Sequence, residues 1–264
     1  MLLIALATGS VILLLAAIVG ATWLPFMRIK QVDVSGAKTV MPDKLQTLTS
    51  RELAGGYAFL FAKGNILLYP RGTIEHDLLQ QFPVLATADV HAENFHTIAI
   101  VVTERQPAAL WCGESLASST SCYLLDKTGT MYAPAVVYSG DAYQKYFGPT
   151  TSGALPRQFL TPPQFHSLSV LVDSLQSRQH LTMQSISVDS VNDVRVMFSN
   201  GFTLIFALSS DSGDLFDRFS LALSSDAFTK HTLSDFQYLD LRFGDKLYYK
   251  LKDGVAASTT PKKK

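Results

Sequence analysis

The sequence predicts an α+β protein in three parts: an N-terminal transmembrane helix, a small β-α-α-β-β domain, and a larger, mostly antiparallel β domain with two helices. Three observations predict this. The chain opens on residues 1–27, which contain no charged side chain. Helical and strand periodicities then alternate over 28–104. Strand patterns separated by turn residues dominate over 105–252.

Residues 2–26 are predicted to be a membrane anchor. At about 1.5 Å of rise per residue, a helix of this length crosses the roughly 30 Å hydrocarbon core of a bilayer. The aromatic residues Trp23 and Phe26 suit the membrane interface. A cleaved secretory signal is the alternative, because Gly20-Ala21-Thr22 can be read as a small-residue cleavage site.

Cys112 and Cys122 are the only two cysteines, and they flank a Gly- and Ser-rich stretch between two strand-like segments. Such a pair can face each other across a hairpin as a disulfide, which would contribute about 2–3 kcal/mol in an oxidising compartment. Two unrelated buried thiols are the alternative. Arg28 and Lys30 point to the opposite side of the membrane from the disulfide. Basic residues that flank a membrane segment normally lie in the cytoplasm, and these two would place the domains that follow them there. The chain has no CxxC or CxxH spacing, so no zinc site is predicted.

The small domain is predicted from its helix and strand signals in order. A strand begins near Ile29 and ends at Ser35-Gly36, and Pro42 opens a helix that Gly55-Gly56 ends. The remaining elements are a helix over Pro70–Gln81 and strands over Ala88–Glu93 and Thr97–Glu104, with Ile98, Ile100 and Val102 facing the core.

The larger domain is predicted from hairpins and two amphipathic helices. Its elements are a hairpin around Lys127-Thr128-Gly129, a helix that buries Phe165, Leu168, Val172 and Leu175, a hairpin with a type I′ turn at Asn200-Gly201, a helix over Asp214–Phe228, and strands over Phe236–Arg242 and Lys246–Lys250. The tail, 253–264, is small, polar and then basic, and is predicted to be disordered.

No catalytic residue, metal ligand or cofactor site is predicted. The chain lacks GxSxG, GxGxxG, GxxxxGK[ST] and HExxH motifs. His91 and His96 flank one hairpin without a third ligand, and Asp189 and Asp193 are expected to be solvated turn carboxylates. The 22 basic and 22 acidic residues argue against nucleic-acid binding, which normally needs a basic excess. An envelope enzyme with an unrecognised active site remains the alternative function.

The C-terminal strands, Phe236–Lys250, are the predicted interaction surface. They are rich in Tyr and Phe, and a last strand often lies at a sheet edge, where its main chain can pair with another chain. An ordinary edge strand, blunted by Lys246 and Lys250, is the alternative.

Several short motifs occur together in a fixed order. They are Val32-Asp33-Val34-Ser35-Gly36, Gly64-Asn65-Ile66, Phe82-Pro83-Val84 with Ala88 and Val90, Thr103-Glu104-Arg105-Gln106-Pro107-Ala108, Leu125-Asp126 with Gly129, the Asn200-Gly201 hairpin and Leu239-Asp240-Leu241-Arg242-Phe243. In this order the chain resembles the POTRA domain and β domain of the cell-division proteins FtsQ and DivIB. The cysteine pair is not part of that pattern, and the basic cytoplasmic tail of the family does not precede the apolar segment.

The resemblance implies a single-pass protein of the cell inner membrane, at the division septum, with its folded domains outside the cytoplasm. It implies a scaffold without enzymatic activity that binds FtsB/DivIC-like and FtsL-like proteins and helps control septal peptidoglycan synthesis. The POTRA domain, 28–104, would contact other division proteins. The partner strand would bind at Leu239, Asp240, Leu241, Arg242 and Phe243, with Tyr248 and Tyr249 as further candidates. Arg242 and Phe243 would be its anchors.

Overall fold

The computed structural model describes residues 2–58, 60–116, 121–136, 142–244 and 246–254, with side chains from residue 8 onward. The chain divides into two compact units, unit 1 over 1–105 and unit 2 over 106–264. The tail predicted to be disordered lies, from residue 255, outside the described residues. Each unit is α+β, and unit 2 is dominated by its sheet.

Unit 1 contains, in chain order, α1 Leu2–Ala21, the 3-10 helix η1 Pro25–Met27, β1 Gln31–Ser35, α2 Pro42–Glu52, β2 Gly56–Tyr57, β3 Phe61–Ala62, α3 Arg71–Gln81, β4 Leu85–Ala92 and β5 Thr97–Glu104.

The predicted transmembrane segment, and with it the single-pass location in the inner membrane, is wrong. Among the residues that the structure describes, none of the helices combines the length and the apolar character needed to cross a bilayer. Helix α1 ends at Ala21, and a turn and then η1 follow, so 2–26 is not one continuous helix.

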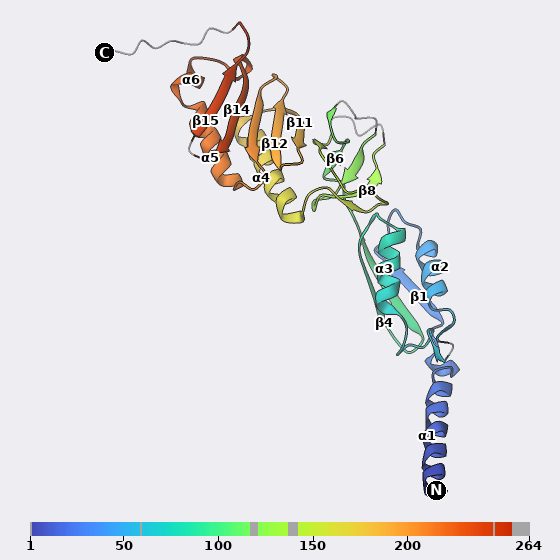
Figure 1. Ribbon diagram of the computed structural model, residues 1–264. Helices are drawn as coiled ribbons and strands as arrows, with labels where there is room; N and C mark the ends of the chain where they lie inside the picture. The colour runs from blue at the N-terminus through green and yellow to red at the C-terminus, as the bar shows by residue number, and fades with distance from the viewer. Residues whose placement is uncertain (1, 59, 117–120, 137–141, 245, 255–264) are drawn as a thin grey trace. The chain divides into compact units, whose positions relative to one another are not determined.

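The core of unit 1 lies between a three-stranded sheet and two helices. The strand order is β1-β5-β4, with β1 parallel and β4 antiparallel to β5. Helices α2 and α3 cover one face of this sheet (Figure 1). The buried side chains that they share with the sheet are Leu45, Leu48, Ile74, Leu78, Val90, Ile98, Ile100 and Val102. The predicted core positions of β5 are thus confirmed, because alternate residues of a strand face the same side.

Glu104, at the end of β5, holds the loop before α2. Its Oε1 accepts hydrogen bonds from the main-chain N–H groups of Lys38 and Thr39, both at 2.7 Å, and of Val40 at 3.1 Å. Desolvation raises the pKa of Glu104, but these hydrogen bonds outweigh it and lower the pKa from its ordinary 4.5 to about 2. The carboxylate therefore binds the main chain just beyond β1, which ends at Ser35.

Unit 2 contains, in chain order, β6 Ala109–Trp111, β7 Tyr123–Leu125, β8 Thr130–Pro134, β9 Lys145–Phe147, β10 Arg157–Gln158, α4 Pro162–Gln179, β11 Met183–Val188, β12 Asp193–Phe198, β13 Thr203–Ala207, α5 Ser212–Leu223, α6 Asp226–Thr229, the 3-10 helix η4 Leu233–Asp235, β14 Phe236–Phe243 and β15 Lys246–Leu251.

These strands form one sheet in the order β10-β8-β7-β6-β9-β11-β12-β13-β14-β15. The β6–β9, β9–β11 and β13–β14 pairs are parallel, and the others are antiparallel. Helices α4 and α5 pack side by side on one face of the sheet (Figure 1). Their apolar side chains, including Phe165 and Phe219, meet Val194, Val196 and Phe198 of β12 in the core. The other face of β12 carries Arg195, as the alternation of a half-buried strand requires.

The hairpin between β12 and β13 has a different turn from the predicted type I′ turn. Type I′ needs positive φ at both Asn200 and Gly201, but only Gly201 has it, with φ 80°. The N–H of Gly201 donates to the carbonyl of Phe198 at 2.9 Å, so the turn is centred on Ser199 and Asn200. The loop is therefore one residue longer than predicted, with Gly201 in the left-handed conformation that closes such hairpins.

Candidate partner-binding edge

The open edge of unit 2 is β15, the last strand of the sheet. It pairs with β14 on one side, and no strand among the described residues pairs with its other side. The opposite edge strand, β10, has only two residues. The unpaired N–H and C=O groups of an edge strand can pair with a strand of another chain. β15 is therefore the longer of the two edges at which this sheet can be extended.

β14, which carries five of the predicted partner-binding residues, lies inside the sheet. It pairs with β13 on one side and β15 on the other, so its main chain is not open to a new strand. Leu239 and Leu241 are buried in the core, and Asp240 is only 5% exposed. These three side chains fix the strand in place. The open main chain belongs to the next strand, which carries Tyr248 and Tyr249.

Arg242 is held by two carboxylates of its own unit. Its Nη2 lies 2.6 Å from Oδ2 of Asp240, its Nε lies 2.9 Å from Oδ1 of Asp240, and its Nη1 donates to Oδ2 of Asp193 on β12. The hydrogen bonds that Arg242 donates, first to Asp240 and then to Asp193, raise its pKa further above the ordinary value. The side chain reaches across β13, where the residue paired with Asp193 is the small Ala207. Arg242 is therefore a clamp between β14 and β12, not a free anchor for a partner.

The turn carboxylates Asp189 and Asp193 are bonded within the chain rather than solvated as predicted. Oδ1 of Asp189 accepts from the N–H groups of Val191 and Asp193, and its Oδ2 pairs with Arg195 at 3.0 Å. Desolvation raises the pKa of Asp189, but these bonds outweigh it and lower the pKa overall. Both carboxylates order the start of β12.

Phe243 and Tyr248 form an exposed aromatic pair where β14 turns into β15. Their ring centroids lie 5.3 Å apart at 84°, an edge-to-face contact, and the residues are 53% and 50% exposed. Cζ of Arg242 lies 5.3 Å from the centroid of the Phe243 ring, so the clamp also supports the pair. Large aromatic side chains held in one conformation lose little entropy on binding a partner.

Tyr249 and Leu247 project from the other face of β15, toward the helices. The Tyr249 ring makes edge-to-face contacts with Phe228 and Phe236, at centroid distances of 5.7 and 5.5 Å. Leu247 lines a shallow cavity of about 390 Å³ between α5 and β15, together with Leu221. Exposed apolar side chains thus flank the open edge on both faces.

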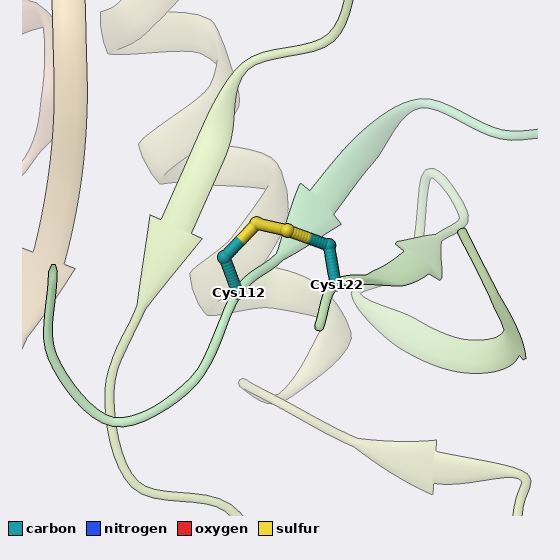
Figure 2. The surroundings of a disulfide bond; sticks show 2 residues. All are labelled: Cys112 and Cys122. Atoms are coloured by element: carbon teal, nitrogen blue, oxygen red, sulfur yellow. A yellow bond between two sulfur atoms is a disulfide. The ribbon is translucent and has the colours of Figure 1, made fainter. Parts of the chain in front are cut away.

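Cys112 and Cys122 are joined by a disulfide, which links the residue after β6 to the residue before β7 (Figure 2). The N–H of Cys112 donates to the carbonyl of Tyr146 on β9 at 2.9 Å. The bridge therefore ties the end of β6 to the start of β7, which are neighbouring strands of the sheet. Part of the loop that it closes, 117–120, lies outside the described residues.

The two histidines of the β4–β5 hairpin do not form a site together. Nδ1 of His91 lies 2.8 Å from Oδ2 of Asp89. The other carboxylate oxygen of Asp89, Oδ1, pairs with Arg71. Within the described ranges, no three His, Cys, Asp or Glu side chains gather as metal ligands. The geometry described so far supports binding through strand addition at β15.

Sequence reasoning missed the clamp between Arg242 and Asp193. The spacing of Asp240 and Arg242 was a usable signal, because residues two apart lie on the same face of a strand. Asp193 is 49 positions away from Arg242, and no local pattern connects them. Only the pairing of β12, β13 and β14 brings the two side chains together.

The chain was compared with known protein families and with curated protein sequences. No model of a known protein family matches the chain, and no curated protein sequence matches it.

Proposed function

We propose that this chain is a non-enzymatic binding module of the FtsQ/DivIB type, in which β15 pairs with a strand of an FtsB/DivIC-like partner. Together with that partner and an FtsL-like protein, it helps control septal peptidoglycan synthesis during cell division. Unit 1 contacts other division proteins. The observation that carries the proposal is the open edge of β15 beside the exposed Phe243–Tyr248 pair.

The chemistry of this edge suits an added strand. Main-chain pairing along Lys246–Leu251 supplies affinity that does not depend on the partner's sequence, and flanking side chains supply specificity. Phe243 and Tyr248 are of the residue types that dominate binding energy at interfaces. Lys246 and Lys250 are both exposed on the same strand and favour acidic side chains in the partner strand.

The order of elements is also the one that the resemblance implies. The three-stranded sheet of unit 1 and its two helices follow each other as β-α-α-β-β, with the short β2–β3 hairpin between the helices, and a sheet-rich unit that ends in a hairpin follows. This order supports the proposal without depending on any single motif.

The double substitution Phe243→Ala with Tyr248→Ala tests the proposed anchors. We expect it to weaken binding of the purified FtsB/DivIC-like protein from the same organism about thirtyfold or more, measured by isothermal titration calorimetry. Phe95→Ala is the matched control, since Phe95 is 68% exposed on the β4–β5 turn of unit 1. Unchanged affinity in the double variant would refute these anchors. Charge reversal at Arg242 is unsuitable here, because it would leave Asp240 and Asp193 unpaired.

Strand addition itself is tested on the partner's side. Partner peptides are made with N-methyl groups on alternate residues, in two complementary sets. Because alternate N–H groups of a strand point to opposite sides, one set blocks pairing with β15 and the other leaves it intact. We expect one set to lose binding and the other to keep it. Equal binding of both sets would show that the partner does not bind as a strand.

A further inference from the structure

Unit 2 contains a second concave surface, separated from β15 by β12, β13 and β14 in the strand order. This surface, here named the α4 cleft, has a volume of about 840 Å³. One wall is helix α4, and the other is formed by the β7–β8 turn and the starts of β9 and β11. The volume lies within the range of about 300–1,000 Å³ that is typical of ligand sites.

Helix α4 turns a polar stripe toward the cleft. His166, Ser169, Asp173 and Gln176 line it, at spacings of three, four and three residues, which place them on one face of the helix. The apolar stripe of the same helix points into the core. Because the core needs only one stripe, the polar stripe is not explained by the packing of α4.

The two ends of the cleft differ in charge. At one end lies Lys127, in the turn between β7 and β8. Gly129 of the same turn lies against the start of α4, because a Cβ added to it would be 2.8 Å from Cγ of Phe165. Asp173 lies eight residues beyond Phe165 on α4, which is about 12 Å along the helix axis. Both charged side chains are exposed, and neither makes a hydrogen bond or ion pair within the described residues. Lys145, which also lines the cleft, already interacts within the chain.

Between the two ends the cleft offers neutral hydrogen-bonding groups. The Tyr146 hydroxyl lies beside Ser169 and Asp173. Burial raises the pKa of Tyr146, the hydrogen bond with Ser169 lowers it, and the charge of Asp173 raises it. The pKa is raised overall, so the hydroxyl stays protonated. Gln144 and Gln184 add two amides. β11 begins at Met183 but pairs with β9 only from Ile186, so its first residues have no strand partner on that side within the described part of the chain. Amide groups and an unpaired strand edge match the main chain of a peptide.

We propose that the α4 cleft binds an extended peptide segment of a partner protein, with an acidic side chain toward Lys127 and a basic side chain toward Asp173. An extended chain advances about 3.3 Å per residue, so the two charged residues of the peptide are about three to four positions apart. The site is separate from the β15 edge, and the proposal does not depend on the function proposed for that edge.

The test is selection of peptides by the intact chain. A phage-displayed library of random heptapeptides is screened against wild type, Lys127→Glu and Asp173→Lys. Wild type should enrich peptides with an acidic and a basic residue about three to four positions apart, in either order. Asp173→Lys should no longer select the basic residue, and Lys127→Glu should no longer select the acidic one. Asp226→Lys is the matched control, because the Asp226 side chain is 97% exposed on α6 and should leave the selection unchanged.

A selected peptide, labelled with fluorescein, then gives affinities by anisotropy. We expect Asp173→Lys to weaken binding about fivefold, and a peptide with Glu in place of its basic residue to restore it. Phe243→Ala with Tyr248→Ala should leave the affinity unchanged. The proposal is overturned if no peptide is enriched, if the cleft variants bind the selected peptides as well as wild type, or if the β15-edge variant loses them.

Discussion

At the scale of single residues, Glu104 shows how one carboxylate replaces a missing stretch of secondary structure. Three consecutive main-chain N–H groups, of residues 38–40, converge on one of its oxygens. Such convergence favours the charged form, because each donor stabilises the negative charge.

The lowered pKa of Glu104 predicts acid sensitivity in unit 1. The folded pKa, about 2, lies below the ordinary 4.5, so this contribution to stability is complete above about pH 4.5 and is lost as the pH falls toward 2. Glu104→Gln should lower the free energy of unfolding at neutral pH and lessen its decline between pH 5 and 2, measured by urea unfolding. Glu93→Gln is the control, because the exposed Glu93 side chain makes no hydrogen bond within the described residues. If the free energy of unfolding fell with pH in parallel for wild type and Glu104→Gln, this role would be contradicted.

Removing the Arg242 clamp should destabilise unit 2. Arg242→Ala leaves the Asp240 carboxylate, which is 5% exposed, without its cation, at a cost of about 2 kcal/mol. Asp193→Asn should cost less, about 0.5–1 kcal/mol, because Asp240 still holds the guanidinium. Guanidinium unfolding of both single variants and the double variant gives the coupling between Asp193 and Arg242. A coupling near zero would mean that the two side chains do not interact in solution.

At the scale of elements, the disulfide reinforces the pairing of β6 with β7. The bridged cysteines are 10 positions apart, and closing a ring of this size should stabilise the folded state by about 2–3 kcal/mol. Cys112→Ser with Cys122→Ser should lose that amount, and dithiothreitol should destabilise wild type but not the variant. Fluorescence of Trp111 follows unit 2 alone in a Trp23→Phe background, since the chain has two tryptophans, one in each unit. Equal stability of oxidised and reduced wild type would contradict this contribution.

The elements also show which features local sequence patterns determine. The helices over 42–52 and 71–81 and the alternating core positions of β5 follow from periodicity, so the sequence predicts them well. The position of β14 does not, because its parallel pairing with β13 depends on the crossover through α5. The apolar residues 2–26 predicted one long helix, but the chain leaves the helix at Ala21. Composition was a poor guide to where that helix ends.

The candidate site was predictable only in part. Aromatic content pointed to the C-terminal hairpin, where Phe243 and Tyr248 are indeed exposed. The resemblance to FtsQ and DivIB assigned the binding residues mainly to β14, whereas the open main chain belongs to β15. The α4 cleft could not be predicted, because its lining comes from six separate segments between residues 108 and 199.

At the scale of the whole molecule, binding at the β15 edge should need only unit 2. The division of the chain at residue 105 separates two hydrophobic cores, each complete within its own unit. A fragment of residues 106–264 should therefore fold and bind the FtsB/DivIC-like protein about as tightly as the full chain does, measured by calorimetry. A folded fragment with much weaker binding would assign part of the interface to unit 1.

The central claim is that a partner strand pairs with β15, and hydrogen–deuterium exchange of the full chain with and without the FtsB/DivIC-like protein tests it most directly. Main-chain N–H groups on the open side of β15 exchange freely until a strand pairs with them. The account predicts that partner binding slows exchange within 246–251 more than anywhere else in unit 2. Unchanged exchange across β15, with protection elsewhere in the chain at saturating partner, would contradict it.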